Sequence, residues 1–265
     1  VVSDVTIADG TVVTVSGVDR MRGRTGEVLL VNGQPSPQLH SPAGSQQRLL
    51  IVNACASRYL DLRLGGLDLL VRGVDSHRRT PQSADRLVLA PGNRADVVIT
   101  TPGKATDLVA AAYDRGQVGM GMMGGGSAIS PESVVLTITA DADAPAPAVA
   151  DAALGARRDL RQAKVDATRT LTMGMGMGGG MGMRFLIDGR TFDPGRTDQS
   201  VTLGTVEDWT IVNDSAMDHP FHLHVWPMQV LRENGADVPD LVVRDVIDVP
   251  ARSSVTVRIA FDRFP

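Results

Sequence analysis

The feature that most constrains how this chain can fold is a sparse internal repeat with an offset of 160 residues. The tripeptide Ile-Val-Asn occurs at 51–53 and again at 211–213, and the openings VNGQPSP (31–37) and IDGRTFDP (187–194) are also alike. Self-similarity of this kind indicates two copies of one domain. Further matches at the offset of 160 are Asp85 with Asp245, Leu87 with Ile247, Leu89 with Val249, Val97 with Val257 and Ile99 with Ile259.

Each copy has the pattern of a β-sandwich. Short runs rich in Val, Ile, Leu and Thr alternate with clusters of Gly, Pro, Asn and Asp. Such runs, bounded by turn residues, predict an all-β fold. Hydrophobic residues make up 43% of the chain, which is enough for a sizeable core. The clearest strand candidates are 26–33, 47–54, 85–100, 132–140, 200–214 and 254–261.

The two copies are joined by a segment of different composition. Residues 141–150 are rich in Pro and Ala, and residues 151–165 have a helical pattern that Asp151 could cap. We therefore expect a first domain over 1–141, a linker with a short helix over 142–169 and a second domain over 170–265.

The repeat carries two further expectations. The first copy runs on for about 40 residues past Ile99, whereas the second stops six residues past Ile259. About 34 residues, including at least one strand, are therefore expected to follow the second copy in a longer protein. The histidines of the second copy have no counterparts in the first, where alignment at the offset of 160 places Tyr59, Leu62 and Leu64 opposite His219, His222 and His224.

Those three histidines, out of five in the chain, lie within the stretch MDHPFHLHVW (217–226). Neutral imidazole is a common ligand for zinc, copper and iron. Residues two apart in a strand share a face, so His222 and His224 should point one way and His219 the other. Pro220 cannot donate to a sheet, so the strand should begin near it. Three histidines do not close a metal site, and further ligands must come from elsewhere.

The stretch HPFHLH, with IVND before it and MQVL after it, resembles the third copper motif of the multicopper oxidases. The first half, with VNGQ, LLIVNA and LVLAPGNRADVVI, resembles the second domain of a three-domain member. The resemblance implies two cupredoxin-like Greek-key β-sandwiches. It assigns His219 to the type 1 copper, His222 to the type 2 copper and His224 to a type 3 copper. Electrons from a small reductant would enter at the type 1 copper and reduce oxygen to water at a trinuclear cluster.

The chain also departs from that family. The fourth motif, HCHxxxHxxx(G)M, and the first domain with its two HxH motifs do not occur in it. Cys55 lies in the first copy and cannot replace the missing thiolate; we expect it to be a small buried residue. The chain is thus identified as domains two and three, truncated before the final motif. Alone, it should have no catalytic residues of its own, incomplete copper centres and no activity.

Two tracts, 119–126 and 173–183, hold eight of the eleven methionines. Thioethers are soft ligands that suit Cu(I), and Met173, Met175 and Met177 would share one face of an extended strand. A flexible Gly-rich loop explains the same composition. We therefore expect the reductant to be either Cu(I) or a phenol or aromatic amine, and the methionines slightly favour Cu(I).

The remaining features exclude some classes of protein and leave others open. A net charge of −4 without a long basic run argues against nucleic acid, and no apolar run reaches the roughly 18 residues of a membrane-spanning helix. The resemblance implies export to the periplasm, cell envelope or medium and a role in copper resistance. A non-catalytic cupredoxin scaffold or copper-binding protein and a trimeric nitrite-reductase-like enzyme are the alternatives, and the oligomeric state stays open. His40 and His77 are expected at the surface, and Trp226 in the core.

Overall fold

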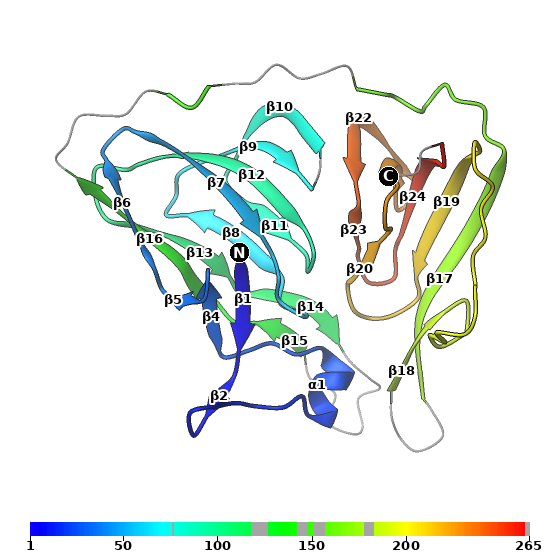
Figure 1. Ribbon diagram of the computed structural model, residues 1–265, viewed down its shortest axis with the longest axis horizontal. Helices are drawn as coiled ribbons and strands as arrows, with labels where there is room; N and C mark the ends of the chain where they lie inside the picture. Colours follow the sequence, from blue (N-terminus) through cyan, green and yellow to red (C-terminus); the bar gives the residue numbers. More distant parts are fainter. Residues whose placement is uncertain (76, 118–126, 142–147, 151–156, 178–182, 263–265) are drawn as a thin grey trace. The chain divides into compact units, whose positions relative to one another are not determined.

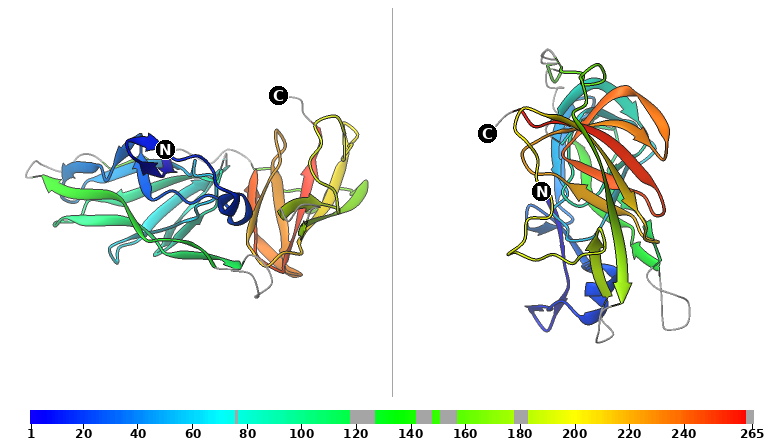
Figure 2. Two further views of the ribbon diagram at one scale, coloured as in Figure 1. Left: turned by 90° about the horizontal axis from the view of Figure 1, so that it is seen from below. Right: turned by 90° about the vertical axis from the view of Figure 1, so that its right-hand side faces the viewer.

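The computed structural model describes the whole chain except residues 76, 118–126, 142–147, 151–156, 178–182 and 263–265 (Figure 1). The chain divides into two compact units. The first comprises Val1–Asp114 and Ile129–Gly155, and the second comprises Arg115–Ala128 and Ala156–Pro265. Nearly all regular structure in the described residues is β-strand, as the sequence predicts (Figures 1 and 2).

The first unit is a sandwich of two sheets around one apolar core. One sheet has the order β10-β9-β12-β7, and the other has the order β11-β8-β13-β16-β6, in which β16 and β6 run parallel. The strands are β1 (Val2–Val5), β2 (Ile7–Ala8), β3 (Thr11–Val12), β4 (Val28–Val31), β5 (Gln34–Pro35), β6 (Gln38–Pro42), β7 (Gln46–Val52), β8 (Leu60–Leu64), β9 (Leu69–Val74), β10 (His77–Ala84), β11 (Leu87–Leu89), β12 (Arg94–Thr100), β13 (Thr106–Ala111) and β16 (Ser133–Asp141).

The second unit has a six-stranded sheet in the order β18-β17-β19-β24-β21-β22 and a two-stranded sheet of β20 and β23. Alternate side chains of β19 and β24, among them Trp209, Ile211 and Val257, form its core. The strands are β17 (Ala167–Met177), β18 (Met183–Ile187), β19 (Val206–Asn213), β20 (His219–His222), β21 (Met228–Glu233), β22 (Ala236–Arg244), β23 (Val246–Val249) and β24 (Ser254–Ala260). A further pair, β14 (Tyr113–Gln117) and β15 (Ser127–Ser130), bridges the division between the units in sequence.

The only helix within the described residues is α1 (Gly17–Arg22). It begins at a capping box, in which the Ser16 hydroxyl accepts from the Asp19 N–H and the Asp19 carboxylate accepts from the Ser16 N–H. The helix predicted over 151–165 is wrong for its described part, 157–165, which is turn and extended chain.

Tertiary contacts explain why that segment is not helical. Arg258 donates to the carbonyls of Leu160 and Arg161, at 3.0 and 2.9 Å, and the Gln229 side chain accepts from the Leu160 N–H at 2.7 Å. Backbone groups that a helix would pair internally are thus paired with the sheet. The following strand, β17, begins at Ala167, inside the segment expected as linker.

The internal repeat is visible in the backbone. Arg94 pairs with Val52 in the first unit, and Ser254 pairs with Val212 in the second, so both pairs differ by the same 160 residues. The two openings also match, because the turns after β4 and β18 place Asn32 and Asp188 at φ 51°. The pairing β1–β4 thus corresponds to the pairing β17–β18.

An asparagine fixes the corner after the first matched strand in each unit. The Asn53 amide donates to the carbonyls of Arg58 and Leu89, both at 2.9 Å. The Asn213 amide donates to the carbonyls of Met217 and Val249, at 2.7 and 2.9 Å. The corner spans five residues from asparagine to carbonyl in the first unit and four in the second.

That shorter corner corrects the alignment of the histidines by one residue. β8 pairs with β11 through Leu60 and Leu89, whereas β20 pairs with β23 through His219 and Val249. His219 therefore corresponds to Leu60 rather than to Tyr59. By the same register, the counterparts of His222 and His224 are Arg63 and Gly65 rather than Leu62 and Leu64, and none of the three is a metal ligand.

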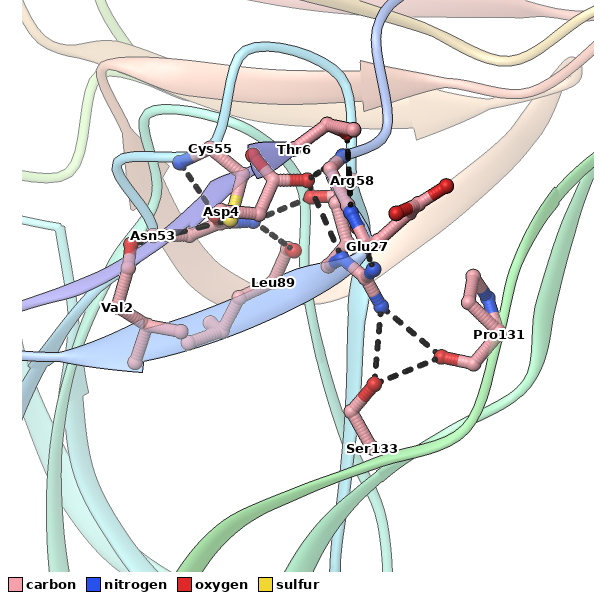
Figure 3. A network of polar contacts seen from close by, with 11 residues as sticks. Val2, Asp4, Thr6, Glu27, Asn53, Cys55, Arg58, Leu89, Pro131 and Ser133 are labelled. Carbon is pink, nitrogen blue, oxygen red and sulfur yellow. Dashed lines mark hydrogen bonds and ion pairs between the residues drawn. The ribbon is translucent and has the colours of Figure 1, made fainter. Parts of the chain in front are cut away.

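The residue that corresponds to Met217 is Arg58, which is fully buried. Its guanidinium donates to the Asp4 carboxylate at 3.3 Å and to the carbonyls of Gly26 and Pro131, at 2.6 and 2.9 Å (Figure 3). The network links three segments to the corner: β1, the residues just before β4 and the residues just before β16. A buried charge paired and hydrogen-bonded in this way is a fixed structural element, because removing one partner leaves the other without compensation.

Candidate metal site

The histidine strand β20 is held by β23. His219 lies opposite Val249, and His222 lies opposite Val246, in an antiparallel register. Asn213 fixes the beginning of this pair through its bonds to the Met217 and Val249 carbonyls. These bonds fix the register of β20 against β23, and the register determines which face of the sheet each histidine side chain lies on.

Side chains alternate along this strand as the sequence predicts. Phe221 and Leu223 pack against the apolar core of the second unit. His222 and His224 are exposed and lie side by side, with ring centroids 4.8 Å apart. His219 is half-buried on the side of Phe221. One short segment thus presents an imidazole on one face and a pair of imidazoles on the other.

The backbone fixes the tautomer of His222. Its Nδ1 lies 2.7 Å from the carbonyl oxygen of Asp245, which also accepts from the Leu223 N–H at 3.1 Å. A carbonyl can only accept, so the Nδ1 of His222 must carry the proton. The lone pair of Nε2 is then available to a metal ion, an arrangement typical of ligating histidines.

A strained turn follows His224. The Trp226 N–H donates to the His224 carbonyl at 2.9 Å, and Val225 between them has φ 76°. A β-branched residue at positive φ is an outlier and indicates local strain. Trp226 packs against the core with its ring 5.2 Å from that of Phe261, as predicted for a core residue.

His219 is more buried than the other two histidines and lies near the positive charge of Arg115. The Phe185 ring lies nearly perpendicular to the His219 ring, at an interplanar angle of 86°, with the two centroids 6.2 Å apart. The pKa of His219 is lowered to about 4, mainly by burial and then by the positive charge of Arg115, while the negative charge of Asp218 opposes the shift. The imidazole therefore stays neutral, with a lone pair for a metal, well below neutral pH.

Arg115 reaches His219 through a close backbone approach. The Asp218 N–H donates to the Arg115 carbonyl at 2.8 Å, and the Arg115 guanidinium donates to the Asp218 carbonyl at 3.3 Å. Gly116 bridges to Met217 with φ 105°, and a Cβ there would lie 2.1 Å from the Ala216 carbonyl oxygen. Only glycine fits this approach.

The second methionine tract forms the hairpin β17–β18 beside the same histidine. Met175 lies opposite Phe185, the residue whose ring contacts His219, and Met173 is buried in the core. Met173 therefore packs as an ordinary core residue. The side chain of Met177, and all of the first tract's methionines and Met181, lie outside the residues whose side chains the structure describes.

The other donor residues do not join this site. Among the residues that the structure describes, no three His, Cys, Asp or Glu side chains converge to hold a metal ion. Cys55 is buried in the first unit, as predicted, and burial raises the pKa of its thiol to about 12. His40 is exposed, 2.8 Å from the Thr139 hydroxyl, whereas His77 is half-buried rather than at the surface.

Sequence reasoning missed three partners of the histidines. Arg115 and Phe185 are distant in sequence and have no motif of their own, and their approach follows from strand pairing. The carbonyl of Asp245 is a backbone group, so its side-chain type carries no signal. The match of Asp245 with Asp85 in the repeat was the one indication that this position is fixed.

Two β-sandwiches, one with a strand of histidines facing both ways, define the cupredoxin class of fold. Two sequence models described as multicopper oxidase match the chain, over residues 5–121 and 162–264. The chain belongs to the multicopper oxidase family.

Individual relatives agree with this assignment. The multicopper oxidase mco of Staphylococcus aureus is 25% identical over 247 residues, which cover 90% of this chain and 47% of that protein. The cell division protein FtsP of Glaesserella parasuis serovar 5 (strain SH0165) is 26% identical, covering 89% of this chain and 50% of that protein. The chain therefore spans about half the length of the curated relatives it matches.

Solved structures show the same fold. A multicopper oxidase of Campylobacter jejuni, described as a metallo-oxidase, is 26% identical with a TM-score of 0.77 and covers 98% of this chain and 57% of its own. The multicopper oxidase McoA of Aquifex aeolicus, at 21% identity, has a TM-score of 0.80 over 100% of this chain and 59% of its own. In the described part of the chain, no helix has the length and apolar character needed to cross a membrane.

Proposed function

We propose that the longer polypeptide to which this chain corresponds is a copper-dependent oxidase. It would take single electrons from a small reductant and reduce oxygen by four electrons to water. The observation that supports this is the phase of β20, which places His219 on the core face and the His222–His224 pair on the other. The family resemblance assigns His219 to a type 1 copper, His222 to a type 2 copper and His224 to a type 3 copper.

The residues present fit copper as parts of two sites. Imidazole nitrogen suits copper, and the bond from the His222 Nδ1 to the Asp245 carbonyl leaves Nε2 for coordination. When bound, copper supplies one-electron redox chemistry. We propose that residues beyond this chain complete both sites, because three histidines on one strand cannot close either.

This chain's own residues orient and protect the histidines. Burial keeps His219 neutral, and the Phe185 ring packs against it in a perpendicular arrangement. The Asp245 carbonyl fixes the plane and the proton of His222. A ligand set that is oriented before the metal arrives binds it with less loss of conformational freedom.

The methionine hairpin favours Cu(I) as the reductant over a phenol or aromatic amine. Met175 on β17 lies opposite Phe185 on β18, and the Phe185 ring packs against His219. A thioether therefore lies one strand away from the ring that contacts this histidine. Soft thioethers bind Cu(I) in preference to harder ions.

The reductant can be tested by replacing the tract methionines with leucine in the longer polypeptide. Met173 would be kept because it packs in the core. Cu(I) oxidation should fall strongly while phenol oxidation is retained. Equal Cu(I) oxidation before and after the substitutions would remove the preference for Cu(I).

The function itself is tested by the copper content and visible spectrum of the longer polypeptide, measured beside this 265-residue chain. In the longer polypeptide we expect type 1, type 2 and type 3 copper and a blue absorption. In this chain we expect neither bound copper nor the blue absorption. His219→Ala should remove the blue absorption and leave the other coppers, and His222→Ala should do the reverse. A colourless, copper-free polypeptide would contradict the proposal.

That last outcome would favour a non-catalytic scaffold or copper-binding protein. One relative carries the name of a cell division protein, which keeps this alternative open. Export to the periplasm, cell envelope or medium is part of the same proposal and rests on the family. Fractionation of cells that produce the longer polypeptide would test it.

A further inference from the structure

A buried arginine lies beside the beginning of the histidine strand. Arg115 is only 8% exposed. Its guanidinium donates to the Asp218 carbonyl at 3.3 Å, and Asp218 directly precedes His219 in the sequence. Arginine is rarely this deeply buried in proteins, because taking its charge out of water is costly. The place of this charge, next to a candidate metal ligand, therefore indicates a role in the site.

The backbone holds the arginine in place. The Asp218 N–H donates to the Arg115 carbonyl at 2.8 Å, so the two residues are bonded in both directions. The next residue, Gly116, has φ 105°, and a Cβ there would lie 2.1 Å from the Ala216 carbonyl oxygen. Only glycine permits so close an approach of the two backbones. The positive charge is thus fixed relative to His219.

The charge of Arg115 is not cancelled at His219. Among the described residues, Arg115 lowers the pKa of this histidine and the negative charge of Asp218 raises it, and the effect of Arg115 is the larger. The buried Arg58 of the first unit provides a contrast, because its guanidinium pairs with the Asp4 carboxylate at 3.3 Å. Arg58 belongs to a neutralised network, whereas Arg115 leaves a net positive potential at the histidine.

We infer that Arg115 is a positioning residue whose fixed positive charge raises the reduction potential of copper bound at His219. The inference rests on the proposed function, in which a reductant delivers its electrons at this histidine. Transfer of one electron oxidises the reductant by one unit, reduces Cu(II) to Cu(I) and lowers the charge of the ion by one. A neighbouring positive charge repels Cu(II) more strongly than Cu(I), so it favours the reduced ion.

Two properties of arginine suit this role. The guanidinium stays protonated at every pH at which proteins are folded, so its effect on the potential should not depend on pH. Burial removes water that would otherwise screen the charge, so its potential reaches farther than that of a surface residue. The result is a greater driving force for withdrawing an electron from the reductant.

The test is the reduction potential of the blue copper in the longer polypeptide, obtained from its visible absorption during a redox titration. Arg115→Gln removes the charge and keeps an amide that can donate to the Asp218 carbonyl. We expect the equilibrium to shift about tenfold toward Cu(II), which lowers the potential by about 59 mV for one electron. Arg115→Leu, a second replacement without charge, should give the same shift, and Arg115→Lys should leave the potential close to its original value.

The matched control of opposite sign is Asp218→Asn. Its side-chain oxygen can still accept from the Ala251 N–H, which donates to Asp218 at 2.9 Å. Removal of this negative charge should raise the potential, whereas removal of the positive charge of Arg115 lowers it. Local distortion of the strand does not produce shifts that follow the sign of the charge removed.

The outcomes separate this inference from the proposed function. A blue absorption with an unchanged potential in both charge-free variants would overturn the inference and leave the oxidase in place. A fall in Arg115→Lys as large as that in Arg115→Gln would also overturn it, because the arginine would then act only as a structural support. A longer polypeptide without any blue absorption would remove the oxidase, and the inference with it.

Discussion

β8 and β20 occupy the same place in two copies of one sandwich, yet they do different things. β8 has leucines on its core face, a strand on each edge and the buried Arg58 at its entrance. β20 has Phe221 and Leu223 on that face, one strand partner in the described residues and Met217 at its entrance. Within the described residues, the core face of the histidine strand is therefore less covered than that of its counterpart.

The largest effect is expected at Arg58, where the copies differ most in chemistry. Arg58→Met gives the first copy the residue found at the equivalent corner of the second, but leaves the Asp4 carboxylate buried without its cation. We expect a loss of about 3–5 kcal/mol in the free energy of unfolding of the first unit. Denaturant unfolding, followed by amide exchange in β8, measures it.

The matched control is the double variant Asp4→Asn with Arg58→Met. Asparagine keeps an acceptor for the Gly26 N–H, which donates to Asp4 at 2.7 Å, and removes the buried charge. The double variant should recover part of the lost stability. If Arg58→Met alone costs no more than the double variant, the network does not act as a charge pair.

A second comparison concerns the core faces of the two strands. Leu64→Ala should cost roughly 2–5 kcal/mol, because Leu64 is fully buried. Leu223→Ala, at the counterpart position, should cost about 1 kcal/mol in this chain because the side chain is half-exposed. Equal losses, measured by denaturant unfolding, would contradict the difference in coverage.

The pH dependence separates the copies at their first matched strand position, His219 against Leu60. A folded-state pKa of about 4 means that the unfolded chain binds more protons than the folded chain between about pH 4 and 6.5. The free energy of unfolding of the metal-free second unit should therefore fall as pH drops through this window, by up to about 3 kcal/mol, and level off below it. His219→Phe should abolish this pH dependence of the free energy of unfolding. If the variant and the original chain have the same pH profile, His219 is not the titrating group.

The smallest effect is expected at the turn after His224. Val225 has φ 76°, and its counterpart in the first copy is Gly66, with φ 82°. Val225→Gly should relieve the strain and stabilise the second unit by about 1 kcal/mol, because the Val225 side chain is 55% exposed and gives up little burial. Val225→Ala keeps the unfavourable φ and should give no such gain in thermal unfolding.

The sequence predicted the all-β fold, the repeat and the faces of the histidines, because each depends on a period that side-chain types reveal. The side-by-side rings of His222 and His224 follow directly from the two-residue spacing. The predicted places of the histidines in the first copy were off by one, because the short corner after Asn213 is visible only in strand pairing.

Other features depend on contacts that local sequence does not encode. The predicted helix failed in its described residues, since Arg258 and Gln229 bind the backbone that a helix would have used. The cover of His219 by Phe185 and Arg115 joins segments far apart in the chain. The domain boundaries and the ligand roles of the three histidines stay predictions.

The corner between Asn213 and Met217 is one residue shorter than its counterpart between Asn53 and Arg58. Because side chains in a strand alternate, a single inserted or deleted residue here would by itself exchange every inward position of β20 for an outward one. The two copies nevertheless keep the same inward positions, Leu62 and Leu64 in β8 and Phe221 and Leu223 in β20, because each strand begins two residues after the carbonyl that its asparagine binds. The asparagine thus absorbs a difference of one residue in the corner without altering which face each strand presents.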